Sequence, residues 1–291
     1  MVKTRIRVAL PSSILSVEPS LIQKSFRVHQ VARWTSIFGV SEVVFYKDFS
    51  TSTEEFNEHL RIIREHWKYL FTPPYLRKIL VPLSPELKYA GMLPPIRLNV
   101  FNVSRKPISG EERLAYVFRG SNGELKAHLG SVEPFKIIGE CSKVNSVVLV
   151  KVISSENREA VCLDKEVYRG PVLASTSSLK ETVTRYRGIV DYIIVTDRKG
   201  SVPTLHEVEG MRGRDLLILF GSPKYDLFEL SEQEHFRIQD YADFIWNTVP
   251  EQKVATVRTE EALIITLAIV NIYLKGIEES VSLWSIKGTH V

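Results

Sequence analysis

The chain has 291 residues, of which 44% are hydrophobic and 25% charged, and its formal net charge at pH 7 is +4. This composition is typical of an ordinary globular protein of about two domains, and no apolar run is long enough to cross a membrane. The N-terminus enters a strand-like segment without the apolar core of a signal peptide. We therefore expect a cytoplasmic protein with no membrane partner. Its small excess of basic residues is compatible with a nucleic acid partner.

Several classes of chemistry have no support in the sequence. The chain lacks the glycine-rich dinucleotide motif, the P-loop, the HExxH motif and the GxSxG motif. Its seven histidines are scattered, so we expect no metal site. The two cysteines, Cys141 and Cys162, form neither a CxxC pair nor a disulfide framework. We expect two free thiols in a reducing compartment.

An alternation of strand and helix opens the chain. The patterns predict a strand over 5–10, a helix from Pro19 to Gly39, and a second strand over 40–46, which together form a parallel β-α-β unit. A second helix begins at the capping-box pattern Ser52-x-x-Glu55 and ends before a proline-rich segment at 73–95. The polar face of the first helix is either an ordinary solvated surface or a phosphate-binding surface. Its candidate RNA-binding cations are Lys24, Arg27 and Arg33.

The middle of the chain, residues 97–167, has a different character. Six short segments predict strands, with a hairpin at Asn122-Gly123: 98–103, 113–119, 124–129, 135–139, 147–153 and 160–163. About 70 residues of this kind suit a five-stranded barrel of the oligonucleotide-binding (OB) type. The basic candidates for RNA binding are Arg113, Arg119 and Lys126. The aromatic candidates for base stacking, each more often a core residue in so small a barrel, are Phe101, Tyr116, Phe118 and Phe135.

Helices and apolar strands return in the C-terminal part. A helix is predicted over 178–186, and strands over 191–196, 215–220 and 244–246. Strands that are apolar on both faces are typical of a parallel sheet covered by helices. We therefore predict one α/β domain, made of residues 1–96 and 168–291, into which a small all-β barrel is inserted.

Three polar loops follow the three C-terminal strands, at 196–200, 220–223 and 247–259. Ligands in open α/β sheets bind beyond the carboxyl ends of the strands, so these loops are expected to converge on a binding site. The last loop is longer than a connection requires, and its neutral polar groups suit an adenine and a ribose. It runs into a helix that Thr259 could cap, with Glu260 and Glu261 in the first turn. For Gly200 and Gly221 taken alone, ordinary turn chemistry is the commoner explanation.

The same residues carry a resemblance to a known family. The motifs are Val195-Thr196-x-x-x-Gly200, Leu217-Ile218-Leu219-Phe220-Gly221 and, most specific, Asn247-x-Val249-Pro250-x-Gln252-x-x-x-Thr256-Val257-Arg258-Thr259-Glu260-Glu261-Ala262. They resemble the SPOUT superfamily of S-adenosylmethionine-dependent RNA methyltransferases, in the archaeal and eukaryotic branch with an inserted OB-like barrel. The segments 9–15, 30–33, 75–78 and 87–95 fit the same branch.

The resemblance implies a deep trefoil knot at the C-terminus, a homodimer, and methyl transfer from S-adenosylmethionine to structured RNA, with ribosomal RNA as the expected substrate. It implies a cofactor pocket formed by Thr196, Gly200, Phe220, Gly221, Ser222, Asn247, Thr248, Val249, Pro250, Gln252, Val254, Thr256 and Thr259. Arg258 is a candidate for holding the target nucleotide, or for an ion pair with an acid such as Glu261. Asp197 and Glu261 are candidates for a catalytic base.

The chain departs from the family pattern at two glycine positions and at Asp197-Arg198, where the pattern leads us to expect Ser-Glu. Lys253 follows the conserved glutamine, and Ser222 follows Gly221. These changes leave open an alternative, an RNA-binding or ribosome-assembly factor of the same fold with weak or no methyltransferase activity. A third reading is a nucleotide-binding α/β enzyme that does not bind RNA.

Overall fold

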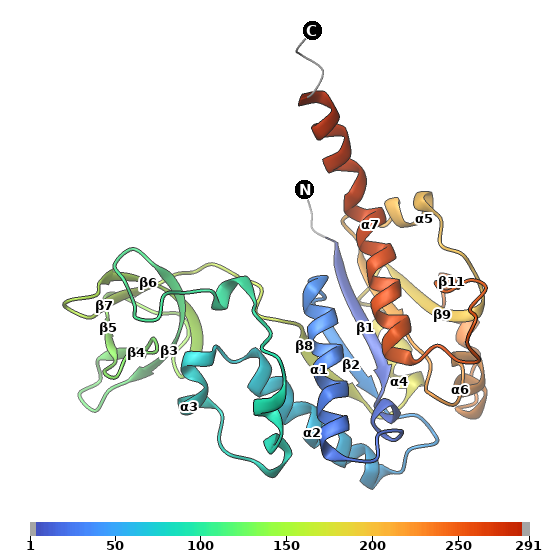
Figure 1. Ribbon diagram of the computed structural model, residues 1–291, viewed down its shortest axis with the longest axis horizontal. Coiled ribbons are helices and arrows are strands. Elements are labelled where there is room, and N and C mark those ends of the chain that lie inside the picture. Colours follow the sequence, from blue (N-terminus) through green and yellow to red (C-terminus); the bar gives the residue numbers. More distant parts are fainter. Residues whose placement is uncertain (1–3, 287–291) are drawn as a thin grey trace. The chain divides into compact units, whose positions relative to one another are not determined.

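The computed structural model describes the backbone of residues 4–286 and the side chains up to residue 275 (Figure 1). Its contacts divide the chain into two compact units, one of Met1–Arg64 with Gly170–Val291 and the other of Glu65–Arg169. The second unit begins well before residue 97, because the segment that precedes the barrel packs against it. Within residues 4–286, no helix is long and apolar enough to cross a membrane.

A six-stranded sheet forms the centre of the first unit, and its order is β11-β9-β10-β1-β2-β8. Every pair of neighbours is parallel, as the doubly apolar strands predict. The strands are β1 (Arg5–Pro11), β2 (Glu42–Tyr46), β8 (Val172–Thr176), β9 (Tyr192–Ser201), β10 (Asp215–Leu219) and β11 (Phe244–Trp246). Only β8 has no counterpart in the sequence reading. Only the last of its five residues is buried, so it lacks the run of buried residues that marks the central strands.

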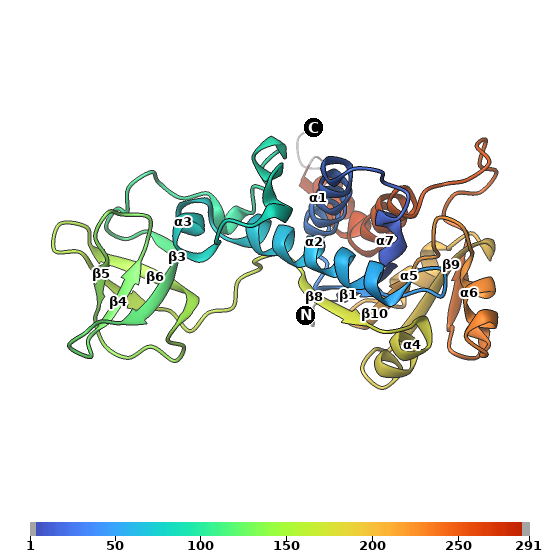
Figure 2. The same ribbon diagram turned by 90° about the horizontal axis from the view of Figure 1, so that it is seen from below.

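Helices cover both faces of this sheet (Figure 2). One face carries α1 (Leu21–Ile37) and α7 (Thr259–Ile286), and the other carries α4 (Leu179–Arg187) and α6 (Leu227–Gln233). The buried cluster under α4 and α6 joins apolar side chains of those helices to one side of strands β1, β2, β9 and β10. The remaining helices are α2 (Thr53–Phe71), α3 (Arg77–Leu80) and α5 (Leu205–Glu209). The N-terminus of α2 confirms half of the predicted capping box, because the Glu55 amide donates to Ser52 Oγ over 3.1 Å.

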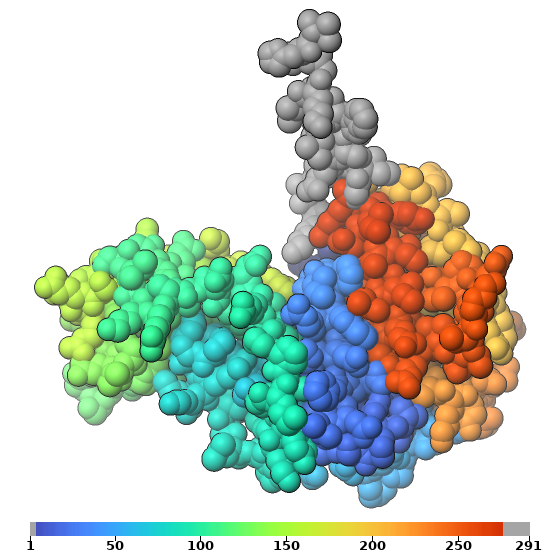
Figure 3. Space-filling view, viewed as in Figure 1, coloured from blue at the N-terminus to red at the C-terminus, as the bar shows by residue number. Residues whose placement is uncertain are grey.

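The helices α1 and α7 come from opposite ends of the sequence and lie side by side (Figure 3). Between Leu263 and Leu274 the helix α7 has no charged residue, which explains why it packs on apolar neighbours over so much of its length. Leu263, Leu267 and Val270 are fully buried. The start of α7 is thereby held against the sheet, next to the ends of β10 and β11.

The second unit contains the closed five-stranded barrel that the sequence predicts, in the order β3-β4-β5-β7-β6. Its strands are β3 (Glu112–Arg119), β4 (Leu125–His128), β5 (Phe135–Ile137), β6 (Ser146–Ser154) and β7 (Glu159–Cys162). The hairpin at Asn122-Gly123 is confirmed, with Gly123 at a φ of +82°. The first of the six predicted strands, 98–103, is wrong: Asn99–Phe101 is a turn of 3₁₀ helix. Because β3 already pairs with β4 and β6, the closed barrel leaves no free edge for it.

The expectation of two free thiols is also wrong, because Cys141 and Cys162 form a disulfide bond. Their Cα atoms lie 5.5 Å apart although 21 positions separate them in the sequence. The parallel pairing of β5 with β7, in which Ile137 faces Ala160, brings the end of β7 beside the segment that follows β5. This pairing is non-local, and the cysteine spacing alone gives no sign of it.

Candidate functional site

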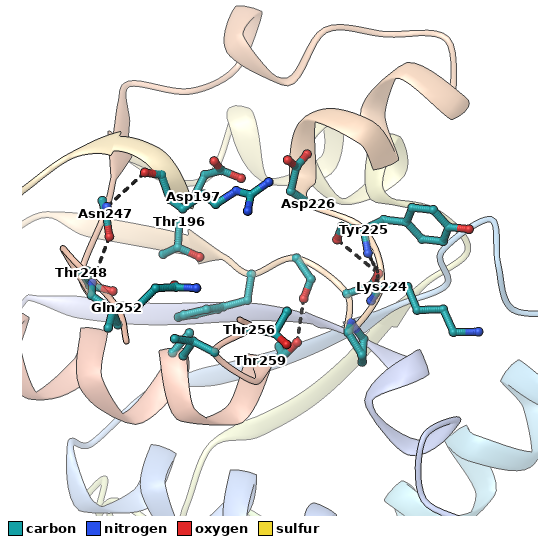
Figure 4. Close-up of a pocket in the computed structure, with 18 of the residues that line it drawn as sticks. Thr196, Asp197, Lys224, Tyr225, Asp226, Asn247, Thr248, Gln252, Thr256 and Thr259 are labelled. Atoms are coloured by element: carbon teal, nitrogen blue, oxygen red, sulfur yellow. Dashed lines mark hydrogen bonds between the residues drawn. The ribbon is translucent and has the colours of Figure 1, made fainter. Parts of the chain in front are cut away.

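The three segments predicted to converge do so, and they enclose a cavity of about 300 Å³ (Figure 4), but the first of them, 196–200, is strand and not loop. Thr196, Asp197 and Arg198 lie within β9, which continues to Ser201, whereas the other two segments are loops that follow β10 and β11, and the first turn of α7 completes the wall. All three strands are parallel, so their carboxyl ends meet at one edge of the sheet. The volume is at the lower end of the range for small-molecule sites. It is therefore large enough for a nucleoside-sized ligand.

Each loop is tied to another by a hydrogen bond from a polar side chain. Thr196 Oγ1 donates to the carbonyl of Leu219 over 2.8 Å, which joins the ends of β9 and β10. Asn247 Nδ2 donates to the carbonyl of Arg198 over 3.0 Å, which joins β11 to β9. These bonds hold the three loops in one arrangement before any ligand binds, which lowers the ordering cost of binding.

The long loop after β11 is organised by its own amide side chains. Asn247 Oδ1 accepts from the amide of Val249 over 3.1 Å. Gln252 Nε2 donates to the carbonyls of Val254 and Ala255 over 3.1 and 3.2 Å. The loop thus has a defined shape, and the donors of Gln252 are used within the loop. This explains why a connection of this length contains so many neutral polar side chains.

The hydroxyl of Thr259, expected to cap α7, has another partner. It donates to the carbonyl of Gly221 over 2.9 Å and so joins α7 to the loop after β10. The N-terminus of α7 is capped instead by Glu261, whose carboxylate accepts a hydrogen bond from the amide of Arg258 over 2.9 Å. The predicted ion pair between Arg258 and Glu261 is thus a contact to the backbone. The hydrogen bond of Thr259 therefore connects two parts of the cavity wall, the first turn of α7 and the loop after β10.

Ten of the thirteen predicted cofactor residues line the cavity, and three do not. The ten are Thr196, Phe220, Gly221, Ser222, Asn247, Thr248, Val249, Gln252, Thr256 and Thr259. Pro250 and Val254 lie on the exposed side of the loop, away from the cavity. Gly200 also lies outside. A Cβ there would meet the carbonyl oxygen of Ile245 at 2.6 Å, so the glycine allows strand β11, not a ligand, to approach closely.

Of the three candidate catalytic residues, only Asp197 lines the cavity. Burial raises the pKa of its carboxyl above the usual value, and the nearby Asp226 adds to this effect. The amide of Lys199 donates to Asp197 Oδ1 over 2.8 Å and opposes the shift. Arg258 and Glu261 are exposed and lie outside the cavity. A raised pKa in a cavity wall is the property expected of a group that exchanges protons.

Several cavity residues were not named as candidate site residues, although Arg198, Pro223, Ala255 and Val257 belong to the three segments predicted to converge. They are Arg198, Pro223, Lys224, Tyr225, Asp226, Glu229, Trp246, Ala255, Val257 and Ala262. Asp226 and Glu229 form a capping box at the start of α6, a pattern that the sequence shows just after the Gly221 loop. Burial opposes ionisation of Asp226, but the amide of Glu229 and the ammonium of Lys199, 3.0 Å away, bring its pKa below the usual value. Asp226 therefore carries a negative charge in a wall that also contains Asp197, Glu229 and the cations Arg198 and Lys224.

Trp246, the last residue of β11, is fully buried in the cavity wall. Its indole Nε1 has no hydrogen-bond acceptor among the described residues. Buried donors without an acceptor are rare in folded proteins, and an acceptor on a bound ligand is one way to satisfy such a donor. The position of Trp246 at a strand end was visible in the sequence, but apolar strand residues are usually core.

The predicted RNA-binding cations fall into two groups, those that are buried or mostly covered and those that are exposed or half-exposed to solvent. Arg27 is buried and paired with Glu18 and Glu260, and Arg113 is buried beside Glu111 with its guanidinium over the Tyr75 ring, so neither is free to bind phosphate. Lys24 is 3.2 Å from Glu58 and mostly covered. The cations that remain exposed or half-exposed are Arg33, Arg119 and Lys126. Among the described residues, no group of acids, histidines and cysteines could hold a metal ion.

Comparison with protein families gives a match along almost the whole chain. Residues 5–270 match the model of the family described as "Putative RNA methyltransferase". The chain belongs to this family. The match spans both compact units, so it includes the barrel as well as the sheet and the cavity.

Individual proteins are also similar to this chain. A 28S rRNA (uridine-N(3))-methyltransferase of Drosophila melanogaster is 25% identical over 90% of this chain and 60% of its own length. The mouse protein of the same description is 26% identical over 90% of this chain and 74% of its own length. A Halobacterium salinarum protein is 26% identical over 89% of this chain and 96% of its own length. A solved AdoMet-bound rRNA methyltransferase of Sinorhizobium meliloti is 9% identical, with a TM-score of 0.35, over 94% of this chain and 56% of its own.

Proposed function

We propose that this protein is an S-adenosylmethionine-dependent RNA methyltransferase of the SPOUT superfamily and that the cavity at the ends of β9, β10 and β11 holds the cofactor. The observation that carries the proposal is the position of this cavity in a chain of an RNA methyltransferase family. It lies where a parallel α/β sheet binds ligands, and the most specific motif of the sequence forms its wall.

The chemistry of the cavity wall fits this cofactor. S-adenosylmethionine carries a sulfonium and an ammonium, both cationic, and Asp197, Asp226 and Glu229 supply negative charge in the cavity wall. Its adenine and ribose present neutral donors and acceptors, which match the polar loop after β11. The unpartnered indole Nε1 of Trp246 is a donor available to one of the cofactor's acceptors.

Methyl transfer from a sulfonium is a direct displacement in which the cofactor supplies an activated methyl group. The protein then has to align the accepting atom with that methyl group and to remove its proton. Prealigned loops serve the first task. For the second, Asp197 is the candidate, because it is the only one of the proposed bases in the cavity wall and because its pKa is raised.

The relatives support a proposal for the substrate class. The Drosophila and mouse proteins are named for methylation of 28S rRNA at uridine N3. We propose ribosomal RNA as the substrate of this chain and a uridine ring nitrogen as its target. A ring nitrogen of this kind carries a proton that must leave, which gives Asp197 its role.

Finer features of the fold are part of the same proposal. We propose that residues 1–96 and 168–291 form the catalytic domain, that the C-terminal segment threads a trefoil knot, and that residues 97–167 form the OB-like RNA-binding insert. We also propose a homodimer in the cytoplasm.

Calorimetry with S-adenosylmethionine tests the cofactor site directly. The wild-type protein should bind it with a dissociation constant well below one millimolar. Trp246→Phe keeps an aromatic ring but removes the indole donor, and it should weaken binding about tenfold. Lys253→Ala is the control within the same loop. Lys253 is 87% exposed and lies outside the cavity, so this variant should bind like the wild type.

No binding at millimolar cofactor would overturn the enzyme proposal and favour the RNA-binding factor as the alternative. Equal affinities of the wild type and Trp246→Phe would instead remove the role of the indole donor only. Comparison of rRNA modification maps in cells with and without the gene identifies the methylated nucleotide.

A further inference from the structure

The outer surface of the barrel carries a stack of aromatic rings that the cavity does not involve. The rings of Tyr116 and Phe118, both on β3, have centroids 6.1 Å apart and planes 16° apart. The ring of His128, on β4, lies 4.8 Å from that of Phe118 with planes 15° apart. All three side chains are half-exposed. Three nearly parallel rings thus stand in a row at the surface of two neighbouring strands.

The register of the barrel explains why these residues share a face. Tyr116 pairs with His128, and Phe118 pairs with Lys126, across the antiparallel β3–β4 ladder. Directly paired residues point to the same side of a sheet, and residues one position away point to the other. The intervening residues belong to the barrel core: Ala115, Val117, Ala127, Leu129, Phe135 and Ile137. Phe135, a stacking candidate from the sequence, is therefore a core residue, whereas Tyr116 and Phe118 are not.

Two lysines extend this face beside the rings. Lys126 pairs with Lys136 on β5, so the row Phe118, Lys126, Lys136 crosses three neighbouring strands. Lys136 is exposed, and within the described part of the chain it has no ion-pair partner. Lys126 lies 2.6 Å from Glu124 of the hairpin, and both side chains are about one-third exposed. Exposed pairs of this kind are weak and can exchange partners, so Lys126 can turn to a phosphate.

The basic excess of the chain lies entirely in the unit that contains the barrel. Residues 65–169 hold 16 Lys and Arg against 11 Asp and Glu, a net charge of +5, whereas the whole chain has +4. The rest of the chain is therefore slightly acidic. A polyanionic partner should favour this unit over the sheet.

We propose that Tyr116, Phe118 and His128, with Lys126 and Lys136, form a binding face for a single-stranded segment of RNA. Bases would extend the stack of rings, and the lysines would contact the phosphates between them. Rings beside a positively charged track are the combination by which proteins bind single strands without reading sequence. A duplex offers no free base faces, so it would gain only the phosphate contacts. The inference depends on the proposed function only in naming RNA as the substrate.

Fluorescence polarisation of the full chain with a labelled 12-nucleotide single-stranded RNA, with and without a matched complementary strand, tests the proposal. Phe118→Leu keeps an apolar side chain but removes the ring, and Tyr116→Leu does the same one pair along. Each should weaken binding of the single strand about 5- to 100-fold, and the duplex by less than twofold. The control is Ile153→Ala, an apolar residue on β6 that is 49% exposed and not part of the face. It should leave both affinities unchanged.

Lysine variants test the phosphate contacts. Lys136→Ala should weaken both forms of RNA and reduce the dependence of affinity on salt, whereas Lys136→Arg should restore both properties. Melting temperatures close to that of the wild type show that the variants are folded, and Phe118→Tyr, which keeps a ring at this position, should bind the single strand like the wild type.

Unchanged affinity of folded Phe118→Leu and Tyr116→Leu for the single strand would overturn the proposal. So would an equal loss for single strand and duplex, because the rings would then act only by shaping the barrel. Calorimetry of the same variants with S-adenosylmethionine separates the two proposals. If the barrel variants bind RNA like the wild type, the proposal for the barrel face is wrong, and cofactor binding is unaffected by that result. If the protein does not bind S-adenosylmethionine, the proposed function is wrong, and the RNA affinities of the variants still test the barrel face.

Discussion

Arg27 of α1 and Glu260 in the first turn of α7 form a buried ion pair, although 233 positions separate them in the sequence. Arg27 Nε also donates to Glu18 over 3.1 Å, so one guanidinium joins both carboxylates. The sequence reading assigned Arg27 to the RNA. The structure gives it the task of holding the start of α7, where Thr259 and Ala262 line the cavity. A residue outside the site thus controls the position of one of its walls.

Removal of the Glu260 carboxylate should therefore destabilise the protein and loosen the cavity. Glu260→Ala leaves a buried arginine with one acid instead of two, and we expect a loss of about 3 kcal/mol in the free energy of unfolding. Glu261→Ala, the neighbouring but exposed acid, should cost less than about 1 kcal/mol through the weakened cap. Urea denaturation of both variants checks this prediction. Equal losses of unfolding free energy in the two variants would show that the buried ion pair of Glu260 stabilises the protein no more than the exposed cap of Glu261.

Gly200 should tolerate no side chain, for a reason of packing between strands. A Cβ at this position would lie 2.6 Å from the carbonyl oxygen of Ile245 and 2.7 Å from the carbonyl carbon of Trp246. Both atoms belong to the backbone of β11, so they cannot move aside without breaking the pairing of β11 with β9. Gly200→Ala should cost about 3 kcal/mol or more. Thermal denaturation of this variant and of Gly188→Ala checks the prediction. A Cβ at Gly188 would meet no atom within 4 Å, so Gly188→Ala should have nearly the stability of the wild type.

The elements that were predicted correctly are those whose sequence pattern lies within a single segment of the chain. The doubly apolar strands 191–196 and 215–220 and the helix after Thr259 are local patterns, and the structure has all three. The edge strand β8, the disulfide and the turn at Asn99–Phe101 depend on which segments meet in space. Pairing partners set their structure, and a single sequence contains no direct record of those partners.

The same distinction separates the cavity residues that could be predicted from those that could not. Thr196, Gly221 and Asn247 follow strands in the sequence, so the rule of strand ends found them. Trp246 is an apolar strand residue of the kind that is usually core, and Tyr225 lies beyond the predicted loop at 220–223, so this rule found neither of them. The charge of Arg27 and Arg113 was visible, but Arg27 is buried against Glu260 of a distant helix, and Arg113 is buried under the ring of Tyr75.

Asp197→Asn should separate a structural role from a chemical one. Burial, with help from Asp226, raises the pKa of Asp197 above 3.8, so the folded protein holds this proton more firmly than the unfolded chain. The ionised carboxylate therefore costs stability as the pH rises from 3.8 through the raised pKa, and this cost remains at neutral pH. Asparagine has no charge and keeps an oxygen for the Lys199 amide. We expect the melting temperature at pH 7 to stay the same or rise, with no gain at pH 3.5.

Methyl transfer by Asp197→Asn should fall about 100-fold if Asp197 removes the proton of the target atom. Cofactor affinity measured by calorimetry should change much less than the rate. Full activity in this folded variant would rule out Asp197 as the base and leave positioning as the main source of catalysis.

His59 should make the protein sensitive to mild acid. Its side chain is fully buried in α2, and neither ring nitrogen has a hydrogen-bond partner among the described residues. Burial, together with the charge of Lys24, lowers its pKa below 6.5 against the opposing effect of Glu55 and other acids. As the pH falls through 6.5, the unfolded chain takes up this proton before the folded protein does, so stability is lost. Melting temperatures between pH 7.5 and 5 measure the loss.

The matched variant His59→Leu removes the titrating group and should flatten this part of the pH profile. The same substitution at the exposed His206 is the control and should leave the profile as it is in the wild type. An unchanged slope in His59→Leu would mean that other groups cause the acid sensitivity.

The disulfide between Cys141 and Cys162 should stabilise the barrel against unfolding. It closes a loop across a sequence separation of 21, and loop-closure entropy for this length corresponds to about 3 kcal/mol. Cys141→Ser should therefore lower the stability of the barrel, and dithiothreitol should lower that of the wild type to a similar level. The reductant should have no further effect on the variant, because both cysteines belong to the one bond. A wild type that is insensitive to dithiothreitol, with two thiols accessible to a labelling reagent in denaturant alone, would show that the pair is reduced in solution.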